Sequence, residues 1–149
     1  MIKPLLIACL YTLPVIATAE GLLHHDSATE LLNVDQAFQL MPVERNGQQL
    51  RVYWEIAPGH YLYRERLIFA AVEPVGATLM SPKLPQGEKH HDEHFGDVHI
   101  YRNAGAAATF RLSGKNPTPT RIKISYQGCA DIGICYPPQT RILDIPTNP

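Results

Sequence analysis

The feature that most constrains the fold is a strict alternation of apolar and polar side chains near the middle of the chain. Within residues 49–57 the apolar positions recur at every second residue: Leu50, Val52, Trp54 and Ile56. A period of two residues is typical of a β-strand with one buried and one exposed face. The pattern recurs along residues 121–127 and 139–145. It predicts a protein built from half-buried strands, with Trp54 in its core.

Turn signals separate these segments. The Asn46-Gly47 pair predicts a hairpin turn before the first of them, because Asn and Gly tolerate a positive φ. Ten glycines and thirteen prolines interrupt the chain, and no segment has the period of a long helix. Residues 20–35 have no period and are expected to form an extended arm. Further strands are expected within residues 38–44, 61–72, 98–102 and 107–112, and a polar loop at residues 90–96. Many short strands between turns predict an all-β, antiparallel β-sandwich.

The first 19 residues have the character of an export signal. A short basic start containing Lys3 is followed by an apolar stretch and by Ala17-Thr18-Ala19. This order is typical of a secretory signal peptide cleaved after Ala19. The uncharged residues 4–19 are fewer than the roughly 20 that a membrane-spanning helix needs. Lipidation at Cys9 is disfavoured, because cleavage there would leave too short an apolar region before the cleavage site. We expect a signal peptide over residues 1–19 and a single soluble domain over residues 20–149, exported to an oxidising compartment.

The charge of the chain argues against a nucleic-acid-binding protein. Thirteen Lys and Arg residues stand against 14 Asp and Glu, which gives a formal net charge of −1. The basic residues form no run, whereas a nucleic-acid surface needs a basic stripe.

Two cysteines remain after the signal, Cys129 and Cys135, and they are separated by five residues. Expected strands flank them, so a disulfide could close the tip of a hairpin. One interpretation is a structural staple, which is common in exported proteins. A loop this short gains only about 2.4 kcal/mol from closure, against about 4.7 kcal/mol for 100 residues, in the chain-entropy model. Redox activity is the second interpretation. Zinc binding is disfavoured, because structural zinc sites use closer and repeated pairs.

A longer run of residues around the pair carries a family resemblance. The run YQGCADIGICYPP, residues 126–138, resembles the active-site segment of the amino-terminal periplasmic domain of DsbD, a transmembrane thiol:disulfide interchange protein. YLYR at residues 61–64, DEHFG at 92–96 and IYR at 100–102 are similar in order and spacing. The likeness covers nearly all of residues 20–149. It implies an immunoglobulin-like sandwich with a redox-active disulfide and no organic cofactor or metal.

The resemblance also implies a role for each cysteine. Cys129 and Cys135 would be the redox pair, with Cys135 forming the mixed disulfide with a partner and Cys129 resolving it. The family accepts electrons through a thioredoxin-like domain. It passes them to periplasmic thioredoxin-fold partners, such as disulfide isomerases and the thiol-reducing protein of cytochrome c maturation. Family members continue into a membrane domain and a thioredoxin-like domain, and the sequence leaves open whether this chain is a fragment or a freestanding version.

A cap loop covers the disulfide in the family, and the match places it at residues 92–96. The family pattern there is acidic-acidic-Phe-Tyr-Gly, so His94 stands where the capping Phe is expected. Either His94 covers the sulfur atoms, or Phe95 does after a shift of one residue. The carboxylates Asp92 and Glu93 are expected to raise the pKa of a nearby thiol by like-charge repulsion. The resemblance also places two aromatic residues near the site, Tyr61 and Tyr63.

Two functions of other classes remain as alternatives. The first is a non-catalytic binding module, in which a structural hairpin disulfide supports a loop that meets a partner. The second is a metal-binding exported protein, since imidazole and carboxylate groups accept zinc or copper. Its candidate ligands are His90, His91, His94, His99, Asp92 and Glu93. The sequence contains no HExxH motif or long histidine tract, so a solvated polar loop is the simpler interpretation of these residues.

Overall fold

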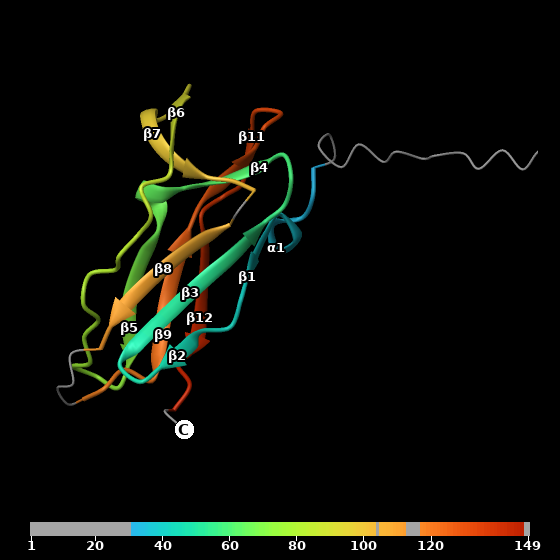
Figure 1. Cartoon of the computed structure of the whole chain (residues 1–149). Helices are drawn as coiled ribbons and strands as arrows, with labels where there is room; N and C mark the ends of the chain where they lie inside the picture. The colour runs from blue at the N-terminus through green and yellow to red at the C-terminus, as the bar shows by residue number, and fades with distance from the viewer. Residues whose placement is uncertain (1–30, 104, 113–116, 148–149) are drawn as a thin grey trace, which may run out of the picture.

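The described part of the chain is almost entirely β-structure. The computed structural model describes residues 31–103, 105–112 and 117–147. Two layers of strands lie against each other along the molecule, and a third sheet lies at one end (Figure 1). All strand pairs within the described residues are antiparallel. This architecture confirms the predicted all-β, immunoglobulin-like antiparallel β-sandwich.

The first layer is organised around one long strand. It contains β1 (Phe38–Leu40), β2 (Glu44–Asn46), β3 (Gln49–Ile56) and β8 (Ala106–Arg111), and β3 pairs with the other three. The alternation predicted for β3 is confirmed, because Leu50, Val52 and Trp54 are fully buried. The single strand expected over residues 38–44 is wrong. Residues 41–43 separate β1 from β2, which pair with opposite ends of β3.

The hairpin before β3 is confirmed, but its turn lies one residue later than expected. Asn46 is still paired with Gln49, so Gly47 and Gln48 form the two-residue turn. Gly47 has a φ of +58°, whereas Asn46 keeps a negative φ. A glycine at the first central position is the pattern of a type II′ turn rather than the type I′ turn that Asn-Gly favours.

The second layer contains β5 (Ile68–Glu73), β9 (Arg121–Tyr126) and β12 (Gln139–Asp144), with β9 in the centre. Its buried face closes the core against β3. The Trp54 ring lies 6.2 Å from the Phe69 ring and 5.7 Å from the Tyr126 ring, centroid to centroid. Both contacts are edge-to-face, the geometry that aromatic pairs prefer. Trp54 therefore joins the two layers, as its place in the alternating segment predicts.

The third sheet carries the cysteines. Its strand order is β11 (Ile134–Cys135), β10 (Gly128–Ala130), β4 (His60–Tyr63), β7 (Gly96–Tyr101) and β6 (Glu88–Asp92). Two connections join this sheet to the second layer. A 3-10 turn, η1 (Arg64–Arg66), leads from β4 to β5, and β9 continues through Gln127 into β10. The continuous segment expected over residues 61–72 is therefore split between two sheets.

The polar loop expected at residues 90–96 is mostly a strand. Residues 88–92 form β6, which pairs with β7 from Glu88↔Ile100 to Asp92↔Gly96. This expectation is wrong because β6 is an edge strand, and an exposed edge needs no apolar alternation. Charged side chains at such an edge discourage pairing with other molecules. Only residues 93–95 form the turn between the two strands.

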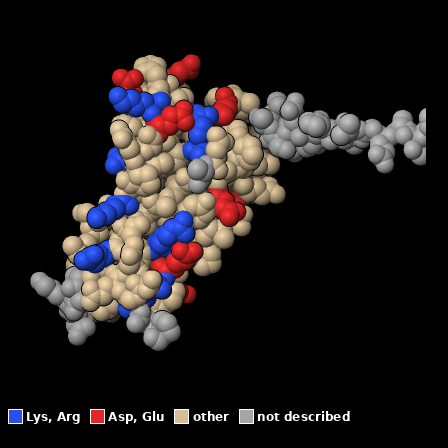
Figure 2. All heavy atoms as spheres, in the orientation of Figure 1, with Lys and Arg blue, Asp and Glu red and all other residues tan. Residues whose placement is uncertain are grey.

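Of the arm expected over residues 20–35, the structure describes residues 31–35, and the last two of them belong to a short helix. Within the described residues, α1 (Val34–Ala37) forms a single helical turn capped by the Asn33 side chain, which accepts from the Gln36 N–H at 3.1 Å. The expected signal peptide, residues 1–19, lies outside the described residues. Across the part of the chain that the structure describes, no helix is long and apolar enough to cross a membrane. On the face shown in Figure 2, basic and acidic side chains are interspersed.

Candidate functional site

Cys129 and Cys135 form a disulfide between the two shortest strands of the third sheet. They lie directly opposite each other on β10 and β11, with their Cα atoms 3.9 Å apart. Residues 131–133 form the turn between the strands, as expected for the tip of a hairpin. Gly128 is required just before Cys129, because an added Cβ would lie 2.2 Å from the Tyr61 carbonyl oxygen. The close approach of β4 therefore fixes the strand that carries the first cysteine.

The two sulfur-bearing residues differ in exposure. Cys129 is fully buried against Tyr61, Tyr63 and Ile100, whereas Cys135 is only partly buried. The strands β4 and β7 continue the sheet beyond β10 and supply the large side chains that cover Cys129. An attacking thiolate from solvent therefore has its easier approach at Cys135.

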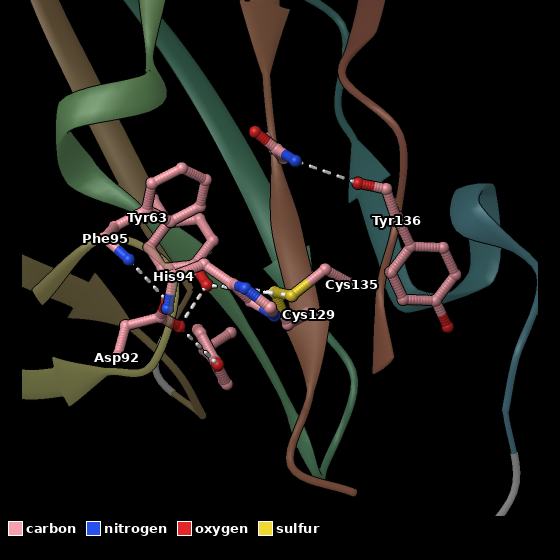
Figure 3. The surroundings of a disulfide bond; sticks show 9 residues. Tyr63, Asp92, His94, Phe95, Cys129, Cys135 and Tyr136 are labelled. Carbon is pink, nitrogen blue, oxygen red and sulfur yellow. Dashed lines mark hydrogen bonds between the residues drawn. A yellow bond between two sulfur atoms is a disulfide. The ribbon is translucent and has the colours of Figure 1, made fainter. Parts of the chain in front are cut away.

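A chain of hydrogen bonds leads from Cys129 to a buried carboxylate. The Tyr63 hydroxyl lies 3.0 Å from Cys129 Sγ and 3.8 Å from Cys135 Sγ. It donates to Asp92 Oδ2, which also accepts from the Tyr61 hydroxyl at 3.4 Å. Figure 3 shows Tyr63 between the carboxylate and the disulfide. The sequence-predicted residues Tyr61, Tyr63 and Asp92 are thus brought together beside the sulfur atoms.

The protonation states of this chain follow from its surroundings. Burial raises the pKa of Tyr63, and its hydrogen bond to the Asp92 carboxylate raises it further. Burial alone would raise the pKa of Asp92, but hydrogen bonds from Tyr63 and from two backbone N–H groups outweigh it and lower the pKa. At neutral pH the negative charge therefore resides on Asp92 and the proton on Tyr63.

Asp92 also shapes the turn of the β6–β7 hairpin. Its Oδ1 accepts from the backbone N–H of His94 at 2.8 Å and of Phe95 at 2.9 Å. A side chain that bonds the backbone two and three residues ahead is a common way to build a tight turn. Glu93 is exposed on this turn and does not join the buried chain. Of the two predicted acidic residues, only Asp92 is therefore linked to the sulfur atoms.

His94 and Phe95 take different positions at the tip of the hairpin. Figure 3 shows the His94 ring pointing toward the two sulfur atoms. The Phe95 ring instead packs on Tyr63 at 5.1 Å, edge to face, with the Arg66 guanidinium 4.3 Å above its centroid. Coverage of the disulfide by His94 stays a prediction, and the Phe95 ring is engaged by Tyr63 and Arg66.

A hollow of about 220 Å³ opens between this hairpin and the cysteine hairpin. Cys135 lies on its wall, so the exposed side of the disulfide faces it. The groups contributed by the β6–β7 hairpin are His90, His91, Asp92, Glu93 and His94, and the opposite side includes Tyr61 and Asp131. The hollow is too small and too polar to resemble a typical ligand pocket.

The histidines do not converge on a common point. His91 Nδ1 pairs with Asp97 at 2.7 Å, and His99 Nδ1 pairs with Glu65 at 3.0 Å. His90 lies against the Tyr61 ring, with centroids 5.0 Å apart. Within the described ranges, no group of three or more His, Cys, Asp or Glu side chains is placed to hold a metal ion.

One ion pair at the site could not be predicted from the sequence. Arg102 donates from Nη1 to both carboxylate oxygens of Asp131, at 2.9 and 3.0 Å. The two residues are 29 positions apart, and only the pairing of β4 with both β7 and β10 brings them together. Their presence in the similar segments at 100–102 and 126–138 was the one available signal.

Comparisons with known proteins agree with this geometry. Residues 28–147 match the family model described as "Thiol:disulfide interchange protein DsbD, N-terminal". The chain is 38% identical over 117 residues to DsbD 2 of Pseudomonas aeruginosa, covering 78% of this chain and 18% of that protein. It is 40% identical over 126 residues to DsbD of Pectobacterium atrosepticum, covering 85% of this chain and 21% of the relative. The chain thus spans about a fifth of the length of these curated relatives.

Solved structures show the same similarity at the level of the fold. The reduced N-terminal domain of Neisseria meningitidis DsbD superposes with a TM-score of 0.68 at 30% identity, covering 80% of this chain and 92% of that one. A complex between the N-terminal domains of DsbD and PilB from the same organism gives the same TM-score and identity, covering 82% of this chain and 92% of that one.

The buried carboxylate generates a prediction about stability and pH. Because the pKa of Asp92 is lowered by folding, its charge stabilises the folded state above the unfolded pKa of about 4, and this contribution is lost as pH falls through the folded pKa. Asp92→Asn should reduce the free energy of unfolding by about 2 kcal/mol at pH 7, measured by urea denaturation. The difference in free energy of unfolding between this variant and the wild type should shrink toward pH 2.

The adjacent Glu93→Gln serves as control and should change stability by about 0.5 kcal/mol or less. An equal loss at both ends of the pH range would contradict the role of the charge.

The position of His94 generates a second prediction. Removing the imidazole should open the approach to Cys135, so His94→Ala should speed reduction of the disulfide by dithiothreitol about two- to fivefold, because exchange depends on access to the attacked sulfur. The rate is measured by quenching with acid and counting free thiols by mass. His99→Ala is the matched control, since His99 pairs with Glu65 and does not line the hollow. If both variants are reduced at the wild-type rate, His94 does not cover the disulfide.

Proposed function

Because the chain belongs to the family of N-terminal domains of the thiol:disulfide interchange protein DsbD, we propose that it performs thiol–disulfide exchange through Cys129 and Cys135. It would accept electrons from a thioredoxin-like donor domain and pass them to thioredoxin-fold acceptors. The observation that carries the proposal is the asymmetry of the disulfide, with Cys129 fully buried and Cys135 at the wall of a hollow. A staple has no need of one accessible sulfur, whereas exchange depends on it.

The reaction consists of two exchanges at sulfur. A thiolate of the donor attacks Cys135 Sγ, which forms a bond between the donor and Cys135 and breaks the Cys129–Cys135 bond. The electron pair of the broken bond leaves on Cys129, which then takes up a proton. The second donor thiolate attacks the mixed disulfide and releases Cys135 as a thiolate. The donor ends as a disulfide and the domain as a dithiol, and the reverse sequence reduces an acceptor.

Tyr63 and Asp92 would serve the buried leaving group. The Tyr63 hydroxyl lies 3.0 Å from Cys129 Sγ, so it can turn its proton from Asp92 toward the departing thiolate. A hydrogen bond to a charged group is stronger than one between neutral groups, which would stabilise the thiolate at this buried position. The Asp92 charge opposes this ionised form and favours its later protonation. Tyr61 supports the pair through its own hydrogen bond to Asp92.

The β6–β7 hairpin would control access. His94 lies on the side of the sulfur atoms, and the turn that carries it is held by Asp92. A partner that approaches Cys135 must displace this tip, while Phe95 remains anchored on Tyr63. Ile132 in the turn and Ile134 next to Cys135 on β11 are exposed at 47% and 44% of their full surface. They offer apolar contact to a partner once the tip has moved.

The compartment and the domain bounds belong to the same proposal. The apolar start and the Ala17-Thr18-Ala19 motif support cleavage of residues 1–19 and export to the periplasm. Residues 20–149 would then form one redox domain, which acts as a protein-disulfide reductase within a relay. The complex of the Neisseria domain with the PilB N-terminal domain supports the proposal that this chain also binds a partner protein. No organic cofactor or metal enters the reaction.

The proposal predicts that only one cysteine captures a partner. A thioredoxin-fold protein with a single active-site cysteine, activated as its thionitrobenzoate disulfide, is mixed with each single-cysteine variant of residues 20–149. Cys129→Ser should form the protein–protein disulfide about tenfold or more faster than Cys135→Ser, because Cys129 is buried. Release of thionitrobenzoate is followed by absorbance and the adduct by mass.

Two controls keep this experiment decisive. Free glutathione disulfide should discriminate less between the variants than the protein partner, and circular dichroism should show both variants folded. If neither variant reacts while both are folded, the disulfide is a staple and the alternative of a binding module takes its place.

A further inference from the structure

One guanidinium connects the parts of the sheet that surround the disulfide. Arg102 follows β7 directly, and its Nη1 donates to both oxygens of Asp131. Its Nε lies 3.6 Å from Glu88 Oε2 at the start of β6. Its Cζ lies 5.2 Å from the centroid of the Tyr61 ring on β4. The side chain is only 24% exposed, so these contacts are partly shielded from water.

Asp131 is the first residue of the turn that joins the two cysteine strands. Its backbone N–H donates to the Gly59 carbonyl at 2.8 Å, and the Gly133 N–H donates to the Ala130 carbonyl at 3.0 Å. The side chains of residues 131–133 are exposed, so packing contributes little to holding the turn. Beyond the disulfide and the β10–β11 pairing at its base, the turn is held by these two backbone bonds and by the ion pair with Arg102.

Asp131 also places a negative charge on the wall of the hollow that Cys135 lines. Burial raises the pKa of Tyr61 on the same wall, and the Asp131 charge acts in the same direction. A carboxylate near a thiol raises the thiol pKa and reduces the fraction of reactive thiolate. Arg102 compensates this charge at hydrogen-bond distance.

We propose that Arg102 is a positioning residue of the exchange site: through Asp131 it holds the turn between the cysteines and cancels the carboxylate charge beside Cys135. The inference rests on the proposed function, because it assigns Arg102 to the same reaction. Arg102 does not touch the reacting sulfur atoms. Its effect on them passes through one carboxylate, so removal of that carboxylate should reverse the electrostatic consequence of losing Arg102.

The test measures the alkylation of Cys135 in the reduced mature chain as a function of pH. Iodoacetamide is the probe, and peptide mass identifies the modified cysteine. Arg102→Gln should raise the midpoint pH of Cys135 by about 0.5 unit, the size expected for one uncompensated charge near the surface. It should also slow reduction of oxidised thioredoxin at pH 7 severalfold. The double variant Arg102→Gln/Asp131→Asn should return the midpoint to the wild-type value.

Two further variants test whether the effect is specific to the Arg102–Asp131 ion pair. Arg121→Gln is the matched control, because Arg121 forms ion pairs with Glu73 and Asp144 in the second layer and should leave the midpoint unchanged. Asp131→Asn alone should lower the midpoint, and it carries the test if Arg102→Gln does not fold. The other titratable groups that face Cys135 are the same in every variant: the Cys129 thiol of the reduced pair, and Tyr61, Tyr63, His90, His91, Asp92, Glu93 and His94.

The outcomes separate this inference from the proposed function. A folded Arg102→Gln domain with the wild-type midpoint overturns the role of Arg102, provided that the wild type reduces thioredoxin. A raised midpoint that Asp131→Asn does not reverse also overturns it, because the effect then bypasses Asp131. A wild-type domain that never exchanges with thioredoxin contradicts the proposed function itself, whatever the midpoints are.

Discussion

The hydrogen bond between the Tyr63 hydroxyl and the Asp92 carboxylate joins the β6–β7 hairpin to β4, the strand that pairs with the strand of Cys129. One end of this link lies 3.0 Å from the sulfur of Cys129. The other end holds the turn of the β6–β7 hairpin through the N–H groups of His94 and Phe95. The position of the β6–β7 turn and the surroundings of the buried sulfur therefore depend on the same carboxylate. A buried charge of this kind is tolerated only when its hydrogen bonds are satisfied, which explains why so many donors converge on Asp92.

The link gives the two cysteines unequal surroundings within one small hairpin. Cys129 is enclosed by aromatic side chains and reached by a tyrosine hydroxyl, whereas Cys135 faces the hollow beside Asp131. The first arrangement suits a leaving group and the second suits a point of attack. The sandwich beneath contributes rigidity, because β9 runs from the core directly into the strand of Cys129. The chemistry is thus placed at the end of a strand whose other residues are fixed by packing around Trp54.

Much of the fold follows from the sequence, because alternation reports a strand with one buried face. It identifies β3, β9 and β12, and it places Trp54 between the layers. It fails for β6, whose exposed edge needs no apolar pattern, and for the break between β4 and β5, which a 3-10 turn makes without glycine or proline.

The candidate site is predictable in its membership but not in its geometry. The segments that resemble the family contain every residue of the Tyr63–Asp92 link. Burial of Cys129 and the pairing of Arg102 with Asp131 depend on strands that are distant in sequence, so no local sequence pattern predicts either feature. The choice between His94 and Phe95 likewise depends on how Asp92 bonds the turn.

The central claim is that the Cys129–Cys135 disulfide is transferable rather than structural. A redox titration of residues 20–149 tests it most directly, with thiols trapped by alkylation and counted by mass at buffered potentials. The account predicts one two-electron transition in the folded domain, well above about −300 mV, the region of structural disulfides that resist reduction. A pair that stays oxidised below that potential, or that is reduced only when the domain unfolds, would contradict it.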